Sequence, residues 1–174
     1  DIGGSKTEIS LVSMGGLVIG RGLDLGGDDF DEAIINYVKM KYGLLIGKNS
    51  AEKLKIEGGG VVRGRDLEHN LPKSLRVSSF EIREAAALEV NKIVRIVCGV
   101  LDEMPTEMTE DVLKRGVVLI GGAAQFDGIA QAIEEETKIN TVAVEEPAQA
   151  VIRGCGELLE EPEVLRRIKT INIR

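Results

Sequence analysis

Residues 1–8 read Asp-Ile-Gly-Gly-Ser-Lys-Thr-Glu and combine an acidic residue, a glycine pair and small or hydroxyl-bearing side chains. Apolar and polar residues alternate after them, so the octet predicts a tight turn that leads into a β-strand. Adjacent glycines let backbone N–H groups approach an anion and point at it. Asp1 could face a metal-bound or a nucleophilic water. An ordinary hairpin turn is the alternative, because Gly-Gly is a common turn dipeptide.

A second glycine stretch, Gly121-Gly122-Ala123-Ala124, follows an apolar run at 117–120 and precedes an amphipathic segment at 125–137. A strand, a glycine turn and a helix in this order can place backbone amides and a helix N-terminus against a phosphate. Neither glycine stretch fits G-x-x-x-x-G-K-[ST] or G-x-G-x-x-G. The two stretches therefore indicate nucleotide binding by a route other than a P-loop or a dinucleotide fingerprint.

The elements that must position these loops predict an α/β chain. Residues 7–13 and 17–25 form two strands around a turn at 14–16, and a helix capped by Asp28 ends at Gly43. A short helix at 50–56 precedes short strands at 61–66 and 74–77. Ser78-x-x-Glu81 is a capping box that opens the longest helix, which ends near 101.

The C-terminal part contains a short helical turn at 109–114 and a last strand at 141–144. Pro147 opens a helix at 148–160, since proline is tolerated at the first helical position. Gly154 and Gly156 inside this helix predict close packing against a neighbouring element, because glycine otherwise weakens a helix. Residues 161–174 form a charged tail with at most a short frayed helix.

Composition limits the classes of function. The 174 residues are 43% hydrophobic and 29% charged, which predicts one globular domain, or one domain plus a small lobe. The net charge of −7 and the absence of Trp argue against a nucleic-acid partner, and the charge also argues against an anionic membrane surface. Cys98 and Cys155 lack metal-ligand spacing, which favours a reduced, cytoplasmic protein. His69 lies in a polar stretch and is expected at the surface.

In order along the chain, five stretches resemble the second half of the bacterial actin MreB family: DIGGSKTEIS, GGDDFDEAIINY, AEKLK, GRDL with LPKS, and LIGGAA. GGDDFDEAIINY is the most specific, and the resemblance extends to about Glu160. It implies the second domain of an actin-like ATPase, with a mixed sheet and flanking helices. A large lobe would comprise residues 1–27 and 78–174, and a small insertion lobe residues 28–77.

The resemblance also implies a site for ATP or ADP with Mg²⁺. Asp1 would meet the metal through water, Glu52 would accept hydrogen bonds from ribose hydroxyls, and Lys55 would lie near the sugar or base. No catalytic residue is implied in this half, so the chain alone is not expected to hydrolyse ATP. The implied nucleotide-binding residues are Asp1, Gly3, Gly4, Ser5, Lys6, Glu52, Lys53, Leu54, Lys55, Gly121, Gly122, Ala123 and Ala124.

Three residues of this set depart from the family pattern. Ser5 stands where the family has a glycine and Lys6 where it has a small hydroxyl residue, and we expect Lys6 to meet a phosphate directly. Ala123 replaces a third glycine, so its methyl group should hinder a positive φ and thicken the backbone's approach to the base. Gly58-Gly59-Gly60 stands where the family has a longer stretch, which predicts a linker and a trimmed small lobe.

By resemblance, the chain is part of an ATP-binding, filament-forming cytoskeletal protein that supports bacterial cell shape together with other morphogenesis proteins. Such filaments are cytoplasmic and membrane-associated in the family, without direct insertion by this half and without nucleic acid. A strand precedes Asp1 in the family, so we expect a longer polypeptide. Two alternatives remain: an actin-fold docking module without nucleotide turnover, and a fragment of a small-molecule kinase of the actin superfamily.

Overall fold

The computed structural model describes residues 1–161, 163 and 164, and the charged tail predicted at 161–174 lies almost entirely outside them. The chain opens with an antiparallel hairpin, β1 (Thr7–Ser13) and β2 (Gly16–Leu23), in which Thr7 pairs with Leu23. Met14 and Gly15 turn the hairpin with φ of 51° and 76°. The first two strands are therefore confirmed.

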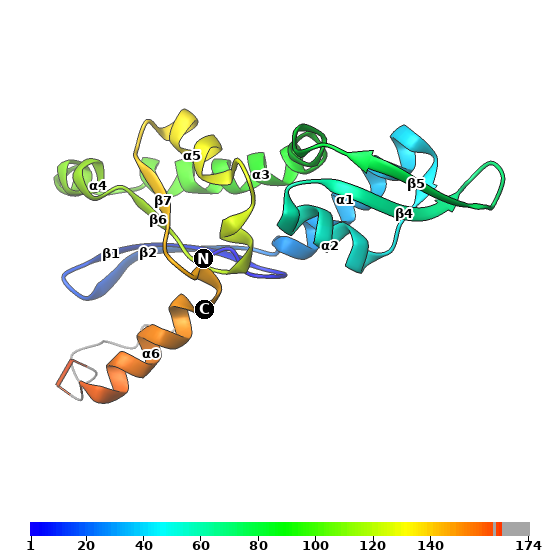
Figure 1. Ribbon diagram of the computed structural model, residues 1–174. Coiled ribbons are helices and arrows are strands. Elements are labelled where there is room, and N and C mark those ends of the chain that lie inside the picture. The colour runs from blue at the N-terminus through cyan, green and yellow to red at the C-terminus, as the bar shows by residue number, and fades with distance from the viewer. Residues whose placement is uncertain (162, 165–174) are drawn as a thin grey trace.

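A group of helices and strands follows on the right-hand side of Figure 1. It comprises α1 (Gly27–Tyr42), β3 (Leu44–Leu45), α2 (Lys48–Glu57), β4 (Gly60–Asp66) and β5 (Pro72–Val77). The three strands form one antiparallel sheet in the order β3-β4-β5. Asp66 and its neighbours turn the chain between β4 and β5, while α1 connects this group to the hairpin.

The remaining elements form the left-hand side of Figure 1. The long α3 (Ser79–Asp102) is followed by η1 (Thr106–Met108), α4 (Thr109–Arg115), β6 (Val117–Leu119), η2 (Gly122–Gln125), α5 (Ile129–Thr137), β7 (Thr141–Ala143), η3 (Pro147–Gln149) and α6 (Ala150–Glu160). Strands β6 and β7 are parallel, with Val117 opposite Thr141. No helix among the described residues is long and apolar enough to cross a bilayer.

The predicted capping box opens α3. The Ser78 side chain accepts the backbone N–H of Glu81, and the Glu81 carboxylate accepts the backbone N–H of Ser78 at 2.9 Å. The predicted apolar stripe of this helix is buried as well: Ile82, Ala86, Val90, Ile93, Val97 and Val100. From Ile82 to Val97 this stripe belongs to one continuous core that runs from Ile2 through both groups of elements. In it the rings of Phe30 of α1 and Phe126 after η2 pack in a tilted arrangement, with centroids 4.9 Å apart.

Helix α1 begins two residues earlier than the sequence predicted, and Asp28 does not cap it. Its N-cap is Gly26, whose backbone N–H donates to the Asp29 carboxylate at 2.7 Å. Asp28 is exposed and pairs with Lys48 at 2.8 Å. The predicted C-terminal stop is confirmed, because Gly43 adopts a left-handed conformation with φ 61°.

The triple glycine is not a linker. Gly58 ends α2 in a left-handed conformation, and the N–H of Gly59 donates to the carbonyl of Leu54 at 2.8 Å. Gly59 has a φ of 109°, and a Cβ there would lie 2.7 Å from the carbonyl oxygen of Val77. Gly60 then starts β4 directly. Glycines are needed here because a helix turns into a strand within three residues against a neighbouring backbone.

Helix α6 departs from the prediction in two ways. It begins at Ala150, after a 3₁₀ turn that contains Pro147, and none of its residues is buried. Among the described residues, no atom outside the backbone of α6 itself lies within 4 Å of the position that a Cβ of Gly154 or Gly156 would occupy. The close packing predicted for these glycines is therefore absent among the described residues. Figure 1 shows α6 projecting away from the β1–β2 hairpin.

Candidate functional site

The first glycine loop is held against the start of α1 by its carbonyl groups. The carbonyl oxygen of Gly3 accepts the N–H of Gly27 at 3.0 Å, and that of Gly4 accepts the N–H of Asp28 at 2.7 Å. A Cβ at Gly26 would lie 2.6 Å from both carbonyl oxygens, so no larger residue fits there. The loop and the helix start therefore form one tightly packed backbone unit.

The carbonyl groups of Gly3, Gly4 and Lys6 accept hydrogen bonds, whereas three amide groups of the loop are unpaired among the described residues. Gly3 donates its N–H to the carbonyl of Lys6 at 2.8 Å and closes the turn. The next three N–H groups, those of Gly4, Ser5 and Lys6, donate to no acceptor among the described residues, and all three residues are exposed. Successive unpaired amides of this kind form a concave partial positive charge that binds anions.

The second glycine loop lies directly against the first residues of the chain. Gly121 has φ 89°, and its N–H donates to the carbonyl of Pro147 at 2.8 Å. A Cβ on Gly121 would overlap the carboxylate of Asp1 and the carbonyl group of Ile2. Ile2 also donates its N–H to Ile120 and accepts the N–H of Ala123. The two loops predicted from separate parts of the sequence therefore meet, with the exposed Asp1 between them.

Ala123 does not have the effect predicted for it. Its φ is not positive, it is 8% exposed, and its methyl group lies 3.3 Å from the place where a Cβ of Gly27 would be. The methyl group therefore packs into the core and does not thicken the open side of the loop. Ala124 is also buried. The loop continues into the 3₁₀ turn η2, and α5 begins only after Gly128, so the helix N-terminus predicted at this loop lies elsewhere.

Helix α2 brings its candidate residues to the same region with different exposures. Glu52 and Lys53 are exposed, and Lys53 lies 3.8 Å from Glu57. The Leu54 side chain is a core residue at 2% exposure, so only its backbone could face a ligand. Lys55 is the residue of this helix that reaches the loops: its Nζ donates to the carbonyl of Gly27 at 2.8 Å.

Lys55 also contacts Asp31 of α1, for which the sequence predicted no part in the site. The Nζ atom of Lys55 lies 2.8 Å from the Oδ1 atom of Asp31, whose side chain is 2% exposed. Burial raises the pKa of Asp31, and the carboxylates of Glu52 and Asp28 add to this, while Lys55 opposes them. The sequence does carry one signal for Asp31, because this charged residue directly follows Phe30 on the side of the helix that faces the core. Its partner Lys55 lies 24 residues later, so no local sequence pattern indicates the pair.

The other charged residues near the loops form surface ion pairs. Lys6 lies 4.0 Å from Asp24, with both side chains largely exposed. The hydrogen bond from Lys48 lowers the pKa of Asp28. Surface pairs of this kind are weak, so the Lys6 ammonium is free to exchange Asp24 for another anion.

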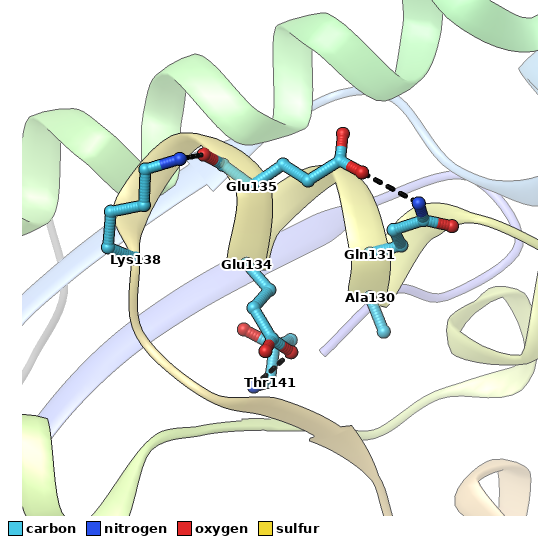
Figure 2. A pocket seen from close by; sticks show the side chains of 6 residues that line it. All are labelled: Ala130, Gln131, Glu134, Glu135, Lys138 and Thr141. Atoms are coloured by element: carbon cyan, nitrogen blue, oxygen red, sulfur yellow. Dashed lines mark hydrogen bonds between the residues drawn. The ribbon is translucent and has the colours of Figure 1, made fainter.

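Two hollows of the described surface lie away from the glycine loops. One, of about 600 Å³, is bordered by α5 and β7, where Gln131 donates to Glu135 and Lys138 to the Glu135 carbonyl (Figure 2). The other, of about 270 Å³, lies between α3, α4 and the end of α5. Neither is lined by a predicted site residue. Asp1, Gly4, Ser5, Lys6 and Gly122 are exposed, so the glycine loops form an open wall.

One cluster of potential metal ligands, Asp66, Glu68 and His69, also lies outside the loops. Asp66 accepts the backbone N–H groups of Glu68 and His69 with one oxygen and Lys73 Nζ with the other. These bonds fix the turn between β4 and β5 and leave little capacity for a cation. His69 is 65% exposed, as predicted.

Comparisons of this chain with known proteins agree on one family. The MreB/Mbl family model matches residues 1–167. The cell shape-determining protein Mbl of Bacillus cereus is 40% identical over 170 residues, which cover 92% of this chain and 51% of that relative. The cell shape-determining protein MreB of Escherichia coli K12 is 41% identical over 170 residues, covering 92% and 49%. The chain therefore spans about half the length of these curated relatives.

Solved structures give the same result for the fold. The crystal structure of MreB 5 of Spiroplasma citri bound to AMPPNP has a TM-score of 0.87 at 28% identity, covering 96% of this chain and 53% of that one. The MamK double helical filament has a TM-score of 0.78 at 22% identity, covering 92% and 53%. The expected actin-like α/β fold is confirmed.

Proposed function

The chain belongs to the MreB/Mbl family, and on that premise we propose that its two glycine loops form one wall of an ATP or ADP site in an actin-like cell-shape protein. The observation that supports this is the row of three amides in exposed residues, Gly4 to Lys6, that donate to no acceptor among the described residues. The first residues of the same loop, Asp1 and Ile2, contact the second glycine loop. Rows of free amides bind phosphate oxygens. A crystal structure of a relative with AMPPNP supports the choice of a nucleotide.

Each part of the wall suits one part of a nucleotide. The free amides and the exposed Lys6 would hold phosphates, and Gly122, whose N–H donates to no acceptor among the described residues, would face the adenosine. Asp1 would hold the water shell of Mg²⁺, because that ion keeps several waters and prefers carboxylate oxygens. The metal would neutralise phosphate charge. Glu52, exposed on α2, would accept hydrogen bonds from the ribose hydroxyls.

The remaining proposals rest on family membership. We expect the complete protein to self-associate into filaments in the cytoplasm, at the membrane, and to act with cell-shape proteins. Turnover of ATP by the chain alone is not expected. Its glycine loops form an open wall, and the nearby carboxylates of Asp28 and Asp31 are engaged in ion pairs with lysines. Catalysis requires a water-excluding and preorganised site.

Chemical-shift perturbation of backbone amides tests the phosphate assignment. We expect ADP and inorganic pyrophosphate to shift the amide signals of Gly4, Ser5 and Lys6. Adenosine without phosphate should shift Gly122 and the exposed residues of α2 instead. Lys6→Ala should weaken ADP binding about fivefold, or about 1 kcal/mol, because one exposed charge-assisted contact is lost.

Lys39→Ala is the matched control, because Lys39 is an exposed lysine in the last turn of α1, at the opposite end from the loops. It should leave ADP binding unchanged. Saturating ADP that shifts none of the three loop amides would contradict the proposed site. If Lys6→Ala and Lys39→Ala lose equal ADP affinity, the effect of Lys6 comes from the general charge of the protein and not from a contact with phosphate.

A further inference from the structure

The ion pair between Asp31 and Lys55 joins two helices next to the glycine loops. Asp31 lies in the second turn of α1 and Lys55 near the end of α2, and the two side chains are 2% and 14% exposed. The Asp31 oxygen that faces Lys55 lies within ion-pair distance but lacks a well-directed hydrogen bond. This pair is therefore buried and incompletely satisfied.

Stability alone does not account for such a pair. Removing two charges from water costs several kcal/mol per ion, and apolar replacements of similar volume are often as stable or more stable. Fixing the arrangement of neighbouring elements is one attested use of buried polar groups. The position of the pair indicates which elements it fixes.

Lys55 contacts backbone that packs against both glycine loops. Its Nζ donates to the carbonyl of Gly27 at 2.8 Å, and the N–H of Gly27 donates to the carbonyl of Gly3 in the first loop. A Cβ at Gly27 would lie 3.3 Å from Lys55 Nζ and 3.3 Å from the methyl group of Ala123 in the second loop. Lys55 thus lies where α1, α2 and both loops meet.

Resting on the proposed function, we propose that Asp31 is a positioning residue of the nucleotide site: through Lys55 it fixes α2, and with it Glu52, relative to the phosphate-facing amides. Glu52 is one helical turn from Lys55, so both lie on neighbouring parts of one helix face. If the Asp31–Lys55 ion pair is lost, Glu52 moves relative to the first loop. Ribose recognition then weakens, while phosphate recognition by the loop amides remains.

The test compares ADP, 2′-deoxy-ADP and inorganic pyrophosphate as ligands of the purified protein. We expect ADP to bind about tenfold more tightly than 2′-deoxy-ADP, because a hydrogen bond to a charged group is worth about 1.5 kcal/mol or more. Asp31→Val combined with Lys55→Met removes the charges and keeps an apolar core. This double variant should fold with stability near that of the unaltered protein and reduce the ADP preference to about twofold or less. Asp31→Asn, which leaves Lys55 in place, should bind pyrophosphate as the unaltered protein does.

Asp31→Asn is the second variant, since it keeps the size of the side chain and removes its charge. It should also reduce the ADP preference. Lys73→Met is the matched control: it breaks the Asp66–Lys73 pair, which has the same 2.8 Å spacing in the same group of elements but lies at the β4–β5 turn. The control should keep the full preference for ADP.

The outcomes separate this inference from the proposed function. If the protein binds ADP and the double variant keeps the tenfold preference, Asp31 has no positioning role and the proposed function stands. Equal binding of ADP and 2′-deoxy-ADP by the unaltered protein would also overturn the inference alone. If both the double variant and Asp31→Asn are unfolded, the Asp31–Lys55 pair serves stability only, and the positioning role is overturned. If neither ADP nor pyrophosphate binds the unaltered protein, the proposed function itself fails, and this inference fails with it.

Discussion

Gly121 occupies a backbone conformation and a space that exclude any side chain. Its φ of 89° and ψ of 156° lie in a region that is essentially restricted to glycine. A Cβ there would also lie 2.6 Å from the carbonyl carbon of Ile2. Gly121→Ala should therefore lower the free energy of unfolding by about 2–5 kcal/mol, the sum of backbone strain and overpacking. Urea unfolding measures this loss.

Gly122→Ala is the neighbouring control. The nearest atom to a Cβ at Gly122 is the Ala148 methyl group at 3.9 Å, which is ordinary contact, and its φ is not positive. The stability of this variant should change by less than about 1 kcal/mol. Equal losses at both positions would mean that the second loop does not depend on the close approach of Gly121 to Ile2.

Glu81 should make stability dependent on pH at the acid end. Hydrogen bonds from Lys41, the Ser78 backbone and Tyr42 lower its pKa from 4.5 to about 2. The folded state therefore binds fewer protons than the unfolded state between these values, and stability rises with pH in this window. This contribution is present above pH 4.5 and is lost as the pH falls towards 2. Glu81→Gln should flatten this part of the stability curve, measured by urea unfolding at pH 2–5.

Glu107→Gln is the matched control for Glu81, because Glu107 is an exposed glutamate of η1 without a contact like those of Glu81. Its stability curve should keep the acid slope of the unaltered protein. A slope that persists in Glu81→Gln would place the responsible carboxylate elsewhere, for example at Asp66, whose pKa is lowered by Lys73 and backbone N–H groups.

Single residues could be predicted where their chemistry is local. The glycine pairs and the Ser78–Glu81 box are recognisable because a turn or a cap depends on adjacent or third-neighbour residues. The effect expected of the Ala123 methyl group was wrong, and the contact of Asp31 with Lys55 was missed, for the same reason. The Ala123 methyl group packs near Gly27, and the Asp31 carboxylate faces Lys55. Both partners are distant in the sequence, so these contacts exist only in the folded chain.

At the scale of elements, helix α6 has little support from the rest of the described chain. It has no buried residue, and Val151, Ile152 and Leu159 are exposed. Gly154 and Gly156 meet open space and weaken the helix without a packing benefit. Gly154→Ala and Gly156→Ala should each stabilise α6 by about 0.5–1 kcal/mol. Slower amide hydrogen exchange of residues 150–160 would measure this gain.

Gly99→Ala is a comparison within α3, where a Cβ also meets open space. This variant separates the general gain of alanine in a helix from an effect specific to α6. If the α6 variants exchange faster or lose stability while Gly99→Ala gains it, the two glycines pack closely against a neighbouring element, as their place inside the helix predicted.

Most elements could be predicted from periodicity and breakers, and the errors lie at their ends. The start of α1 was misplaced because its first N–H groups are taken by the carbonyls of Gly3 and Gly4, so an aspartate cap is unnecessary. Gly58 to Gly60 were interpreted as a linker because composition cannot show that Gly59 packs against Val77. Element ends depend on such tertiary contacts more than element centres do.

At the scale of the whole molecule, family resemblance predicted what composition could not. Length and charge indicated only a globular α/β chain, whereas GGDDFDEAIINY indicated the family that the comparisons then supported. The division into lobes at 27/28 and 77/78 stays a prediction. In the structure the hydrophobic core is continuous across that division, from Phe30 and Val62 on one side to Phe126 and Ile133 on the other.

A continuous core predicts that the two lobes unfold together. The chain has no Trp, and its two tyrosines, Tyr37 and Tyr42, both lie in α1 on the small-lobe side of the division. Tyrosine fluorescence thus reports one lobe and far-ultraviolet circular dichroism reports the whole chain. The two signals should give coincident urea transitions, because helix α1 packs against α3 as well as α2 and cannot leave without opening the shared core. A tyrosine transition at a lower urea concentration would show instead that residues 28–77 unfold as a separate unit. The Asp31–Lys55 ion pair would then lie within a unit that unfolds before the rest of the chain.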